Sequence, residues 1–197
     1  MPAGAEVKLR LVTDYRELNK AVLRPAHPFP SAPDLMRRLK PESKYFCKLD
    51  AVHGYFQIPL DEPSSHLTTF LLPCGRYRYT CAPMGLKSSS DEFCRRPDEA
   101  LTGLLDDWLM KIVDDMLIQA PTWDLLYHRV RVVLERCRLH GNRLSKKKFA
   151  FGTSVKFVGF VMDANGVKPD PDKIAACLLY TSPSPRDLST SRMPSSA

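Results

Sequence analysis

The chain has 197 residues, with 29 Lys and Arg against 22 Asp and Glu, and therefore a formal net charge of +7. This length suffices for one domain with a proper hydrophobic core. Because no apolar run reaches ~18 residues, the sequence excludes a membrane-spanning helix. The positive charge favours a polyanionic partner, although many unrelated proteins share this balance.

The six cysteines have no paired spacing. No two of them form a CxxC motif, and their irregular positions argue against a disulfide framework or a zinc site. The first residues also lack the pattern of a signal peptide. We therefore expect reduced thiols and an intracellular, cytoplasmic protein that does not bind a membrane.

The first forty residues predict short elements separated by prolines. Alternation over 9–15 favours a strand, with 16–19 as its turn. Four prolines within 25–33 keep the backbone extended. Ser31 with Asp34 then forms a capping box for a short helix.

The next segment predicts a strand and a hairpin. The apolar run 45–49 is typical of a short strand, and it leads directly into Asp50. Residues 70–73 and 77–81 flank a Cys-Gly-Arg turn, which indicates a β-hairpin.

A helix is expected after this hairpin. Ser89 and Glu92 form a second capping box, and the helix would run toward Leu105. Pro97 lies inside it, and a proline in a helix removes one hydrogen bond and clashes with the carbonyl four residues earlier. We therefore expect either a kink at Phe93 or a damaged copy of the gene.

The second half predicts two hairpins around one long helix. The first hairpin carries Asp114 and Asp115, and the second surrounds Asn165-Gly166, with strands at 155–162 and from Val167. The helix between them has a cap at Thr122 and a stop at Gly141. Its expected buried face is Leu126, Val130, Val133, Leu134 and Cys137.

This order of elements predicts an α+β fold, an antiparallel sheet with packed helices. We assign residues 1–176 to one domain. Residues 177–197 are rich in serine and proline and have no periodicity, so we expect them to be disordered. We interpret this tail as foreign sequence rather than evolved structure.

Three acids stand out from this pattern. Asp114 and Asp115 lie between apolar residues, and Asp50 ends another apolar strand. Buried carboxylates repel one another and lose hydration, so they need a compensating cation. Carboxylates at the ends of apolar strands are what a two-metal phosphoryl-transfer site requires. Taken alone, an Asp-Asp pair is better explained as a polar hairpin turn.

Five segments follow one another in a fixed order that resembles one known family. Together they resemble the fingers and palm of a reverse transcriptase from a gypsy-type LTR retrotransposon. The segments are LRLVTDYRELNK (9–20), KLDAVHGYFQIPL (48–60), TTFLLPCGRYRYTCAPMGLKSSSDEF (68–93), KIVDDMLI (111–118) and KFVGFVMDANGVKPDPDKI (156–174).

The resemblance implies a right-hand polymerase fold without a thumb and a two-metal site. Asp50 and Asp114 would hold two Mg²⁺ ions, for which Mn²⁺ is a substitute, and Asp115 would support the site beside the primer terminus. Magnesium prefers hard oxygen ligands, which suits aspartate. All three residues are therefore candidate catalytic and metal-binding residues.

The resemblance also implies residues that bind the incoming dNTP. Arg10 would contact the triphosphate, because a guanidinium matches phosphate oxygens. Tyr55 would leave no room for a 2′-hydroxyl and so select deoxynucleotides, with Gly54 beside it permitting close backbone approach. Met84 would pack on the sugar or base. The alternatives are a solvated arginine, a core tyrosine and simple packing.

Other residues would bind nucleic acid by the same resemblance. Lys87 would touch template phosphate, and Val158, Gly159 and Phe160 would form the hairpin that grips the primer end. The run 146–148 is another candidate for phosphate contact. Solvated lysines and an ordinary pair of strands are the alternatives.

We therefore expect a fragment of an RNA-directed DNA polymerase that adds dNTPs to a primer 3′-hydroxyl on an RNA or DNA template. It would be part of a longer polyprotein. The alternative is a catalytically inactive nucleic-acid-binding remnant of a decayed or domesticated retroelement, and a third possibility is a structural domain with incidental charge.

Overall fold

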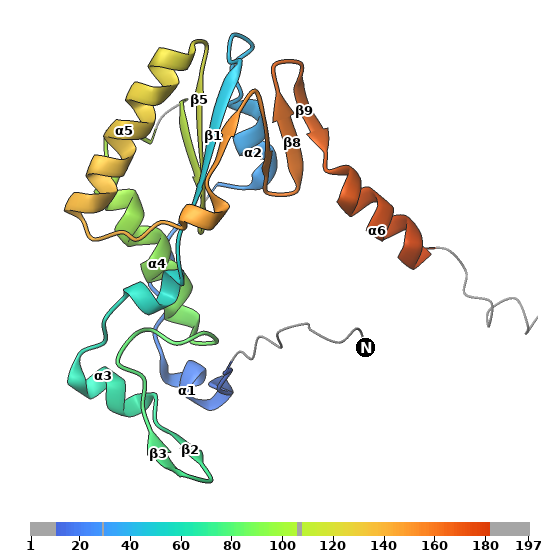
Figure 1. The fold of residues 1–197 in the computed structure, drawn as a ribbon. Coiled ribbons are helices and arrows are strands. Elements are labelled where there is room, and N and C mark those ends of the chain that lie inside the picture. Colours follow the sequence, from blue (N-terminus) through green and yellow to red (C-terminus); the bar gives the residue numbers. More distant parts are fainter. Residues whose placement is uncertain (1–10, 29, 106–107, 182–197) are drawn as a thin grey trace, which may run out of the picture.

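The computed structural model describes residues 11–28, 30–105 and 108–181 of the chain. Its central layer is an antiparallel four-stranded sheet in the order β4-β5-β1-β6 (Figure 1). The strands are β1 (Tyr45–Asp50), β4 (Leu109–Ile112), β5 (Asp115–Ala120) and β6 (Ala150–Gly152). The strand predicted at 45–49 and the hairpin that carries the Asp-Asp pair are both confirmed.

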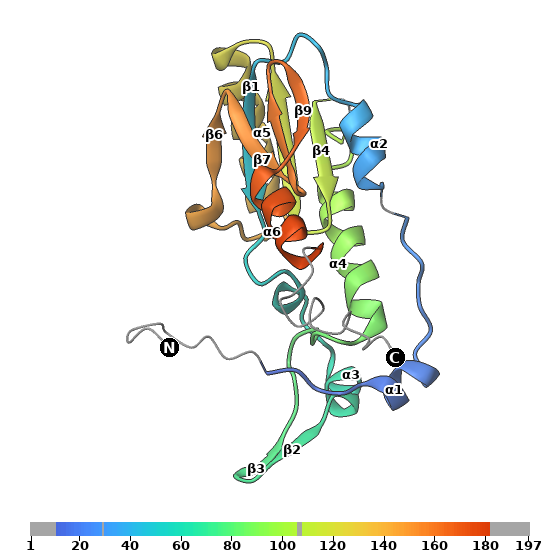
Figure 2. The ribbon, with the colours of Figure 1, turned by 90° about the vertical axis from the view of Figure 1, so that its right-hand side faces the viewer.

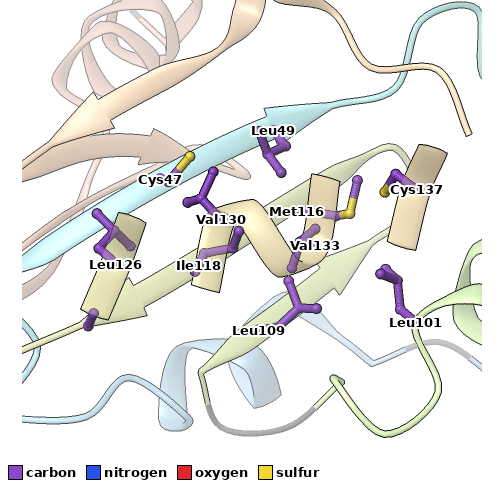
Figure 3. Close-up of a cluster of buried hydrophobic side chains, with 11 residues drawn as sticks. Cys47, Leu49, Leu101, Leu109, Met116, Ile118, Leu126, Val130, Val133 and Cys137 are labelled. Atoms are coloured by element: carbon purple, nitrogen blue, oxygen red, sulfur yellow. The ribbon is translucent and has the colours of Figure 1, made fainter. Parts of the chain in front are cut away.

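Helix α5 (Trp123–Leu139) covers one face of this sheet. Thr122 caps it by accepting a hydrogen bond from the Leu125 amide, and Gly141 follows its end with φ +72°, as predicted. Leu134 is 38 % exposed, so its predicted place on the buried face is wrong. Figure 3 shows the cluster of apolar side chains between the helix and the sheet.

The opposite face of the sheet is covered by α2 (Ala32–Arg37) and a second, three-stranded sheet (Figures 1 and 2). Ser31 caps α2 as predicted, since its side chain accepts a hydrogen bond from the Asp34 amide. The strands of the second sheet are β7 (Ser154–Phe157), β8 (Phe160–Asp163) and β9 (Gly166–Pro169). The single strand predicted at 155–162 is therefore wrong, because the chain turns at Val158–Gly159, whereas the hairpin around Asn165 is confirmed.

A smaller region lies at the far end of α4 from the four-stranded sheet (Figure 1). Its aromatic rings pack together, with Phe56 stacked on Tyr79 and Phe70 stacked on Tyr77. Its elements are α1 (Arg16–Ala21), the 3₁₀ helix η1 (Gly54–Gln57), α3 (Glu62–Leu67), β2 (Phe70–Leu72) and β3 (Gly75–Tyr77).

Two predictions about this region need correction. Residues 11–15 form no strand, and the expected turn at 16–19 is the helix α1. The predicted hairpin exists, but its turn lies at Pro73–Cys74 and its second strand is Gly75–Tyr77. Glycine therefore begins a strand rather than forming the turn.

Helix α4 (Lys87–Ala100) joins the two regions (Figure 1). The predicted cap at Ser89 is wrong, because the helix begins two residues earlier and the Ser89 hydroxyl donates to the Pro83 carbonyl. Pro97 is buried inside the helix, which continues past it to Ala100 and does not reach Leu105. The proline is therefore accommodated in the last turn.

An extended segment between α1 and α2 runs beside α4 (Figure 2). Arg24 forms an ion pair with Asp91, whose side chain is 1 % exposed. His27 Nε2 lies 2.7 Å from Asp98 Oδ2, and Lys111 Nζ lies 2.7 Å from Asp98 Oδ1. Asp98 therefore links the N-terminal segment, α4 and strand β4 through one partly buried carboxylate.

Helix α6 (Pro171–Thr181) follows the second sheet and crosses the predicted domain boundary after residue 176. Of the tail 177–197 for which we predict disorder, residues 177–181 instead continue α6, and residues 182–197 lie outside the described residues. Among the described helices, none combines the length and apolarity that crossing a bilayer requires.

Asp98→Asn should destabilise the protein by about 3 kcal/mol, because it leaves the Lys111 ammonium buried without its counter-ion. The Lys111 side chain is only 5 % exposed. Denaturant unfolding measures the change, and adding Lys111→Met to the same protein should recover most of the loss.

The matched control is Glu99→Gln on the same helix, which removes an exposed carboxylate paired with Arg95. We expect it to cost less than about 1 kcal/mol. Equal losses for Asp98→Asn and Glu99→Gln would contradict the importance of the buried contact.

Candidate active site

Strands β1 and β5 bring the three predicted acids to one corner of the sheet. Asp50 is paired directly with Asp115 in the antiparallel register. Asp114 lies in the turn between β4 and β5, where its carbonyl accepts a hydrogen bond of 3.0 Å from the Ala51 amide. Carboxylates that are far apart in sequence therefore meet because of strand pairing.

The two-residue period of a strand decides which way these side chains point. Phe46 and Leu117 pack in the cluster under α2 and the second sheet, while Cys47 and Met116 pack under α5. By this alternation Asp50 and Asp115 project toward the second sheet and away from α5.

Burial and mutual repulsion disfavour ionisation at this corner. Burial raises the pKa of Asp114, and the neighbouring charges of Asp50 and Asp115 raise it further. Burial also raises the pKa of Asp115, although Lys48 opposes that shift. Asp114 and Asp115 therefore favour a nearby cation or a bound proton over the bare carboxylate form.

Two lysines partly compensate the charge. Lys148 Nζ lies 2.9 Å from both carboxylate oxygens of Asp50. Lys48 Nζ lies 3.0 Å from Asp115 Oδ1, which is an ion-pair distance without hydrogen-bond geometry. Within the described ranges, Asp114 Oδ1 and Asp115 Oδ1 are buried oxygens without a hydrogen-bond partner.

These oxygens without hydrogen-bond partners, of which Asp115 Oδ1 also faces Lys48, fit a divalent cation. Mg²⁺ binds hard oxygen donors, and buried carboxylate oxygens that accept no hydrogen bond supply them. Among the described residues, no three acidic, His or Cys side chains already converge on one metal position. Coordination would therefore require some of these side chains to change rotamer.

Tyr55 lies on η1, the segment that follows β1. Its hydroxyl lies 3.1 Å from Ser90 Oγ, and its ring meets Phe93 edge-on at 5.6 Å between centroids. A Cβ at Gly54 would lie 2.6 Å from the Phe93 ring. The close approach that we expected at Gly54 is thus made by the Phe93 ring on α4.

The loop that carries Met84 is held by α1. The Asn19 side chain donates to the Gly85 carbonyl at 2.8 Å and accepts from the Lys87 amide at 2.9 Å. Met84 and Lys87 are both half-buried. Their proposed contacts with dNTP and template stay predictions, and Arg10 lies outside the described residues.

Among the described residues, three other than glycine have a positive φ: His53, Val113 and Val158. A β-branched residue in this conformation is a genuine outlier and persists only where its surroundings impose it. Val113 and Asp114 form the turn between β4 and β5. Val158 and Gly159 form the turn between β7 and β8, and Phe160 follows it. Strained backbone therefore lies at two of the predicted functional turns.

Sequence reasoning missed two of the site's cations. Lys48 stands two residues before Asp50 and so shares its face of the strand, a signal that the sequence contains. Lys148 belongs to the lysine run for which we gave phosphate contact and simple solvation as alternatives, and its ammonium forms an ion pair with Asp50. That contact forms only because the tertiary fold brings the segment after α5 next to the end of β1.

Known proteins share this fold. The dRH form of the foamy viral protease-reverse transcriptase, in complex with double-stranded DNA, superimposes with a TM-score of 0.80 at 24 % identity, over 91 % of this chain and 32 % of that one. The foamy viral protease-reverse transcriptase in complex with an RNA/DNA hybrid superimposes with a TM-score of 0.79 at 23 % identity, over 88 % of this chain and 24 % of that one. The α+β fingers-and-palm fold of polymerases is confirmed.

Sequence comparisons identify the family. The model described as "Reverse transcriptase (RNA-dependent DNA polymerase)" matches residues 4–162. The Pol polyproteins of Drosophila melanogaster transposons 412 and gypsy are 32 % and 33 % identical over 97 % and 88 % of the chain. The enzymatic polyprotein of cauliflower mosaic virus (strain CM-1841) is 32 % identical over 82 %. The chain belongs to the reverse transcriptase family and is of the gypsy retrotransposon type. It spans 15 %, 17 % and 24 % of these three relatives.

The raised pKa of Asp114 predicts a pH-dependent stability difference. A carboxyl whose pKa is raised above 3.8 in the folded state stabilises the fold at low pH and loses that contribution as the pH rises. In EDTA, Asp114→Asn should therefore gain stability relative to wild type as the pH rises above about 4, measured by thermal unfolding. Mg²⁺ should then stabilise wild type more than the variant.

Asp163→Asn is the control of opposite sign. A hydrogen bond from the Asn165 amide, and to a lesser extent one from Lys168, lowers the pKa of Asp163. The Asp163 carboxylate therefore stabilises the fold above about pH 3.8, and this contribution is lost in acid. The variant should lose stability relative to wild type as the pH rises. Parallel pH profiles for the two variants would refute the assigned electrostatics.

Proposed function

We propose that this chain is the fingers and palm of an RNA-directed DNA polymerase that adds dNTPs to a primer 3′-hydroxyl. The observation that carries the proposal is the pairing of Asp50 with Asp115, beside Asp114 and its unpartnered buried oxygen. Membership of the reverse transcriptase family supports the reaction class. The foamy viral reverse transcriptase that shares this fold binds an RNA/DNA hybrid, which supports the class of ligand.

The three acids would hold two Mg²⁺ ions, with Mn²⁺ as a substitute. Bound there, divalent ions lower the pKa of the primer hydroxyl and neutralise charge on the triphosphate. Asp50 and Asp114 are the proposed ligands of both ions. Asp115, held by Lys48, would support the site beside the primer terminus.

The remaining residues would position the substrates. Tyr55, fixed by Ser90 and Phe93, would exclude a 2′-hydroxyl by occupying its space. Met84 would pack on the sugar or base. We further propose Arg10 as a triphosphate contact.

Nucleic acid would bind along the same face. Lys87 would contact template phosphate, and the turn at Val158–Gly159 with Phe160 would hold the primer end. The second sheet that carries this turn packs on the face toward which Asp50 and Asp115 project. The five described cysteines are free thiols, which agrees with a cytoplasmic site of action within a longer polyprotein.

The inactive remnant is the second candidate. Pro97 would be a sign of decay if it broke α4, but the helix accommodates this residue in its last turn. The three acids and the strand register that joins them favour the catalytic function.

Primer extension separates the two candidates. On poly(rA)/oligo(dT) with Mg²⁺, Asp114→Asn should reduce the extension rate at least ~100-fold, or about 2.7 kcal/mol of transition-state stabilisation. Asp163→Asn, which removes a carboxylate on β8, should extend as wild type does. Equal extension by wild type and Asp114→Asn would defeat the catalytic proposal, and binding without extension by wild type would favour the remnant.

A further inference from the structure

Lys148 is placed at Asp50 by the backbone around it. The Ser145 amide donates to the Asp50 carbonyl at 2.8 Å, and Ala51 forms a β-bridge with Leu144. Lys148 ends the 3₁₀ helix η2 (Lys146–Lys148) that starts immediately after Ser145. The segment is thus fixed to the end of β1, with the Lys148 side chain directed at the carboxylate.

One ammonium engages the whole Asp50 carboxylate. The two distances from Lys148 Nζ, to Oδ1 and to Oδ2, are both 2.9 Å. A divalent ion bound by Asp50 would use the same oxygens at ~2 Å. Two cations that share one carboxylate at these distances repel strongly in a partly buried site.

Only one partner of this ion pair is free to move. The Lys148 side chain is 65 % exposed, whereas that of Asp50 is 8 % exposed and belongs to the strand. Lys48 differs, because its side chain is 20 % exposed and it faces a single oxygen of Asp115. Lys111 contacts α4 through Asp98 and Cys94, and so does not occupy the Asp50 oxygens.

We propose that Lys148 is a built-in cation that competes with the divalent metal for Asp50, so that metal binding requires its side chain to swing into solvent. The inference rests on the proposed function for the identity of the metal site. It assigns Lys148 a positioning role, which sets the metal affinity of the site and keeps Asp50 compensated when metal is scarce.

Calorimetric titration with Mn²⁺ alone tests the competition. Lys148→Met should bind Mn²⁺ about tenfold more tightly than wild type, equivalent to about 1.4 kcal/mol. Lys146→Met removes the same charge from the same short helix. Because Lys146 is exposed and has no ion pair within the described residues, its loss should change the affinity less than about twofold.

Thermal unfolding gives the reciprocal readout. In EDTA, Lys148→Met should melt at a lower temperature than Lys146→Met, because Asp50 loses its cation while facing Asp115. Saturating Mn²⁺ should raise the melting temperature of Lys148→Met more than that of wild type. Opposite shifts in the two conditions distinguish competition from a general loss of stability.

Mn²⁺ titration distinguishes failure of the Lys148 competition from failure of the proposed metal site. If wild type and Lys148→Met bind Mn²⁺ equally, and Asp50→Asn abolishes binding in both, the competition is overturned and the proposed metal site stands. If neither wild type nor Lys148→Met binds Mn²⁺, the proposed function fails and the inference fails with it. Binding by Lys148→Met alone would support the inference in its strongest form.

Discussion

The antiparallel register of β1 with β5 places Asp50 directly opposite Asp115, and the candidate site is arranged around that pair. A shift of one residue in this register would turn one of the two carboxylates to the opposite face of the sheet. The buried clusters on both faces oppose such a shift, because each strand alternates apolar residues between them. Core packing thereby fixes the geometry of the acids.

Charge compensation is the second constraint. The acids are partly buried, and Lys48 and Lys148 approach them on the sheet face that is turned toward β7–β8. Lys111 neutralises Asp98 on the side of α4, where the same carboxylate also meets His27. The candidate site and the connection to the smaller region thus depend on separate ion pairs.

The sequence predicts the elements whose signals are local. The strand into Asp50, the Asp-Asp hairpin and the α5 cap at Thr122 need only nearby residues. Helix α1 is different, because Asn19 holds it against a distant loop through Gly85 and Lys87. Such tertiary contacts decide between turn and helix, and they are not readable from a short alternating run.

The candidate site likewise contains residues that the sequence predicts and a contact that only the tertiary fold creates. The three acids could be identified as site residues from the apolar residues beside them in the sequence. The position of the Lys148 ammonium at Asp50 could not, because it depends on how the chain folds back after α5.

Anomalous diffraction from Mn²⁺, in crystals with primer–template and a non-reactive dNTP analogue, tests the central claim most directly. We predict two peaks ~3.5–4 Å apart, bound by Asp50 and Asp114 oxygens. Manganese peaks away from both carboxylates, with nucleotide bound, would contradict that claim.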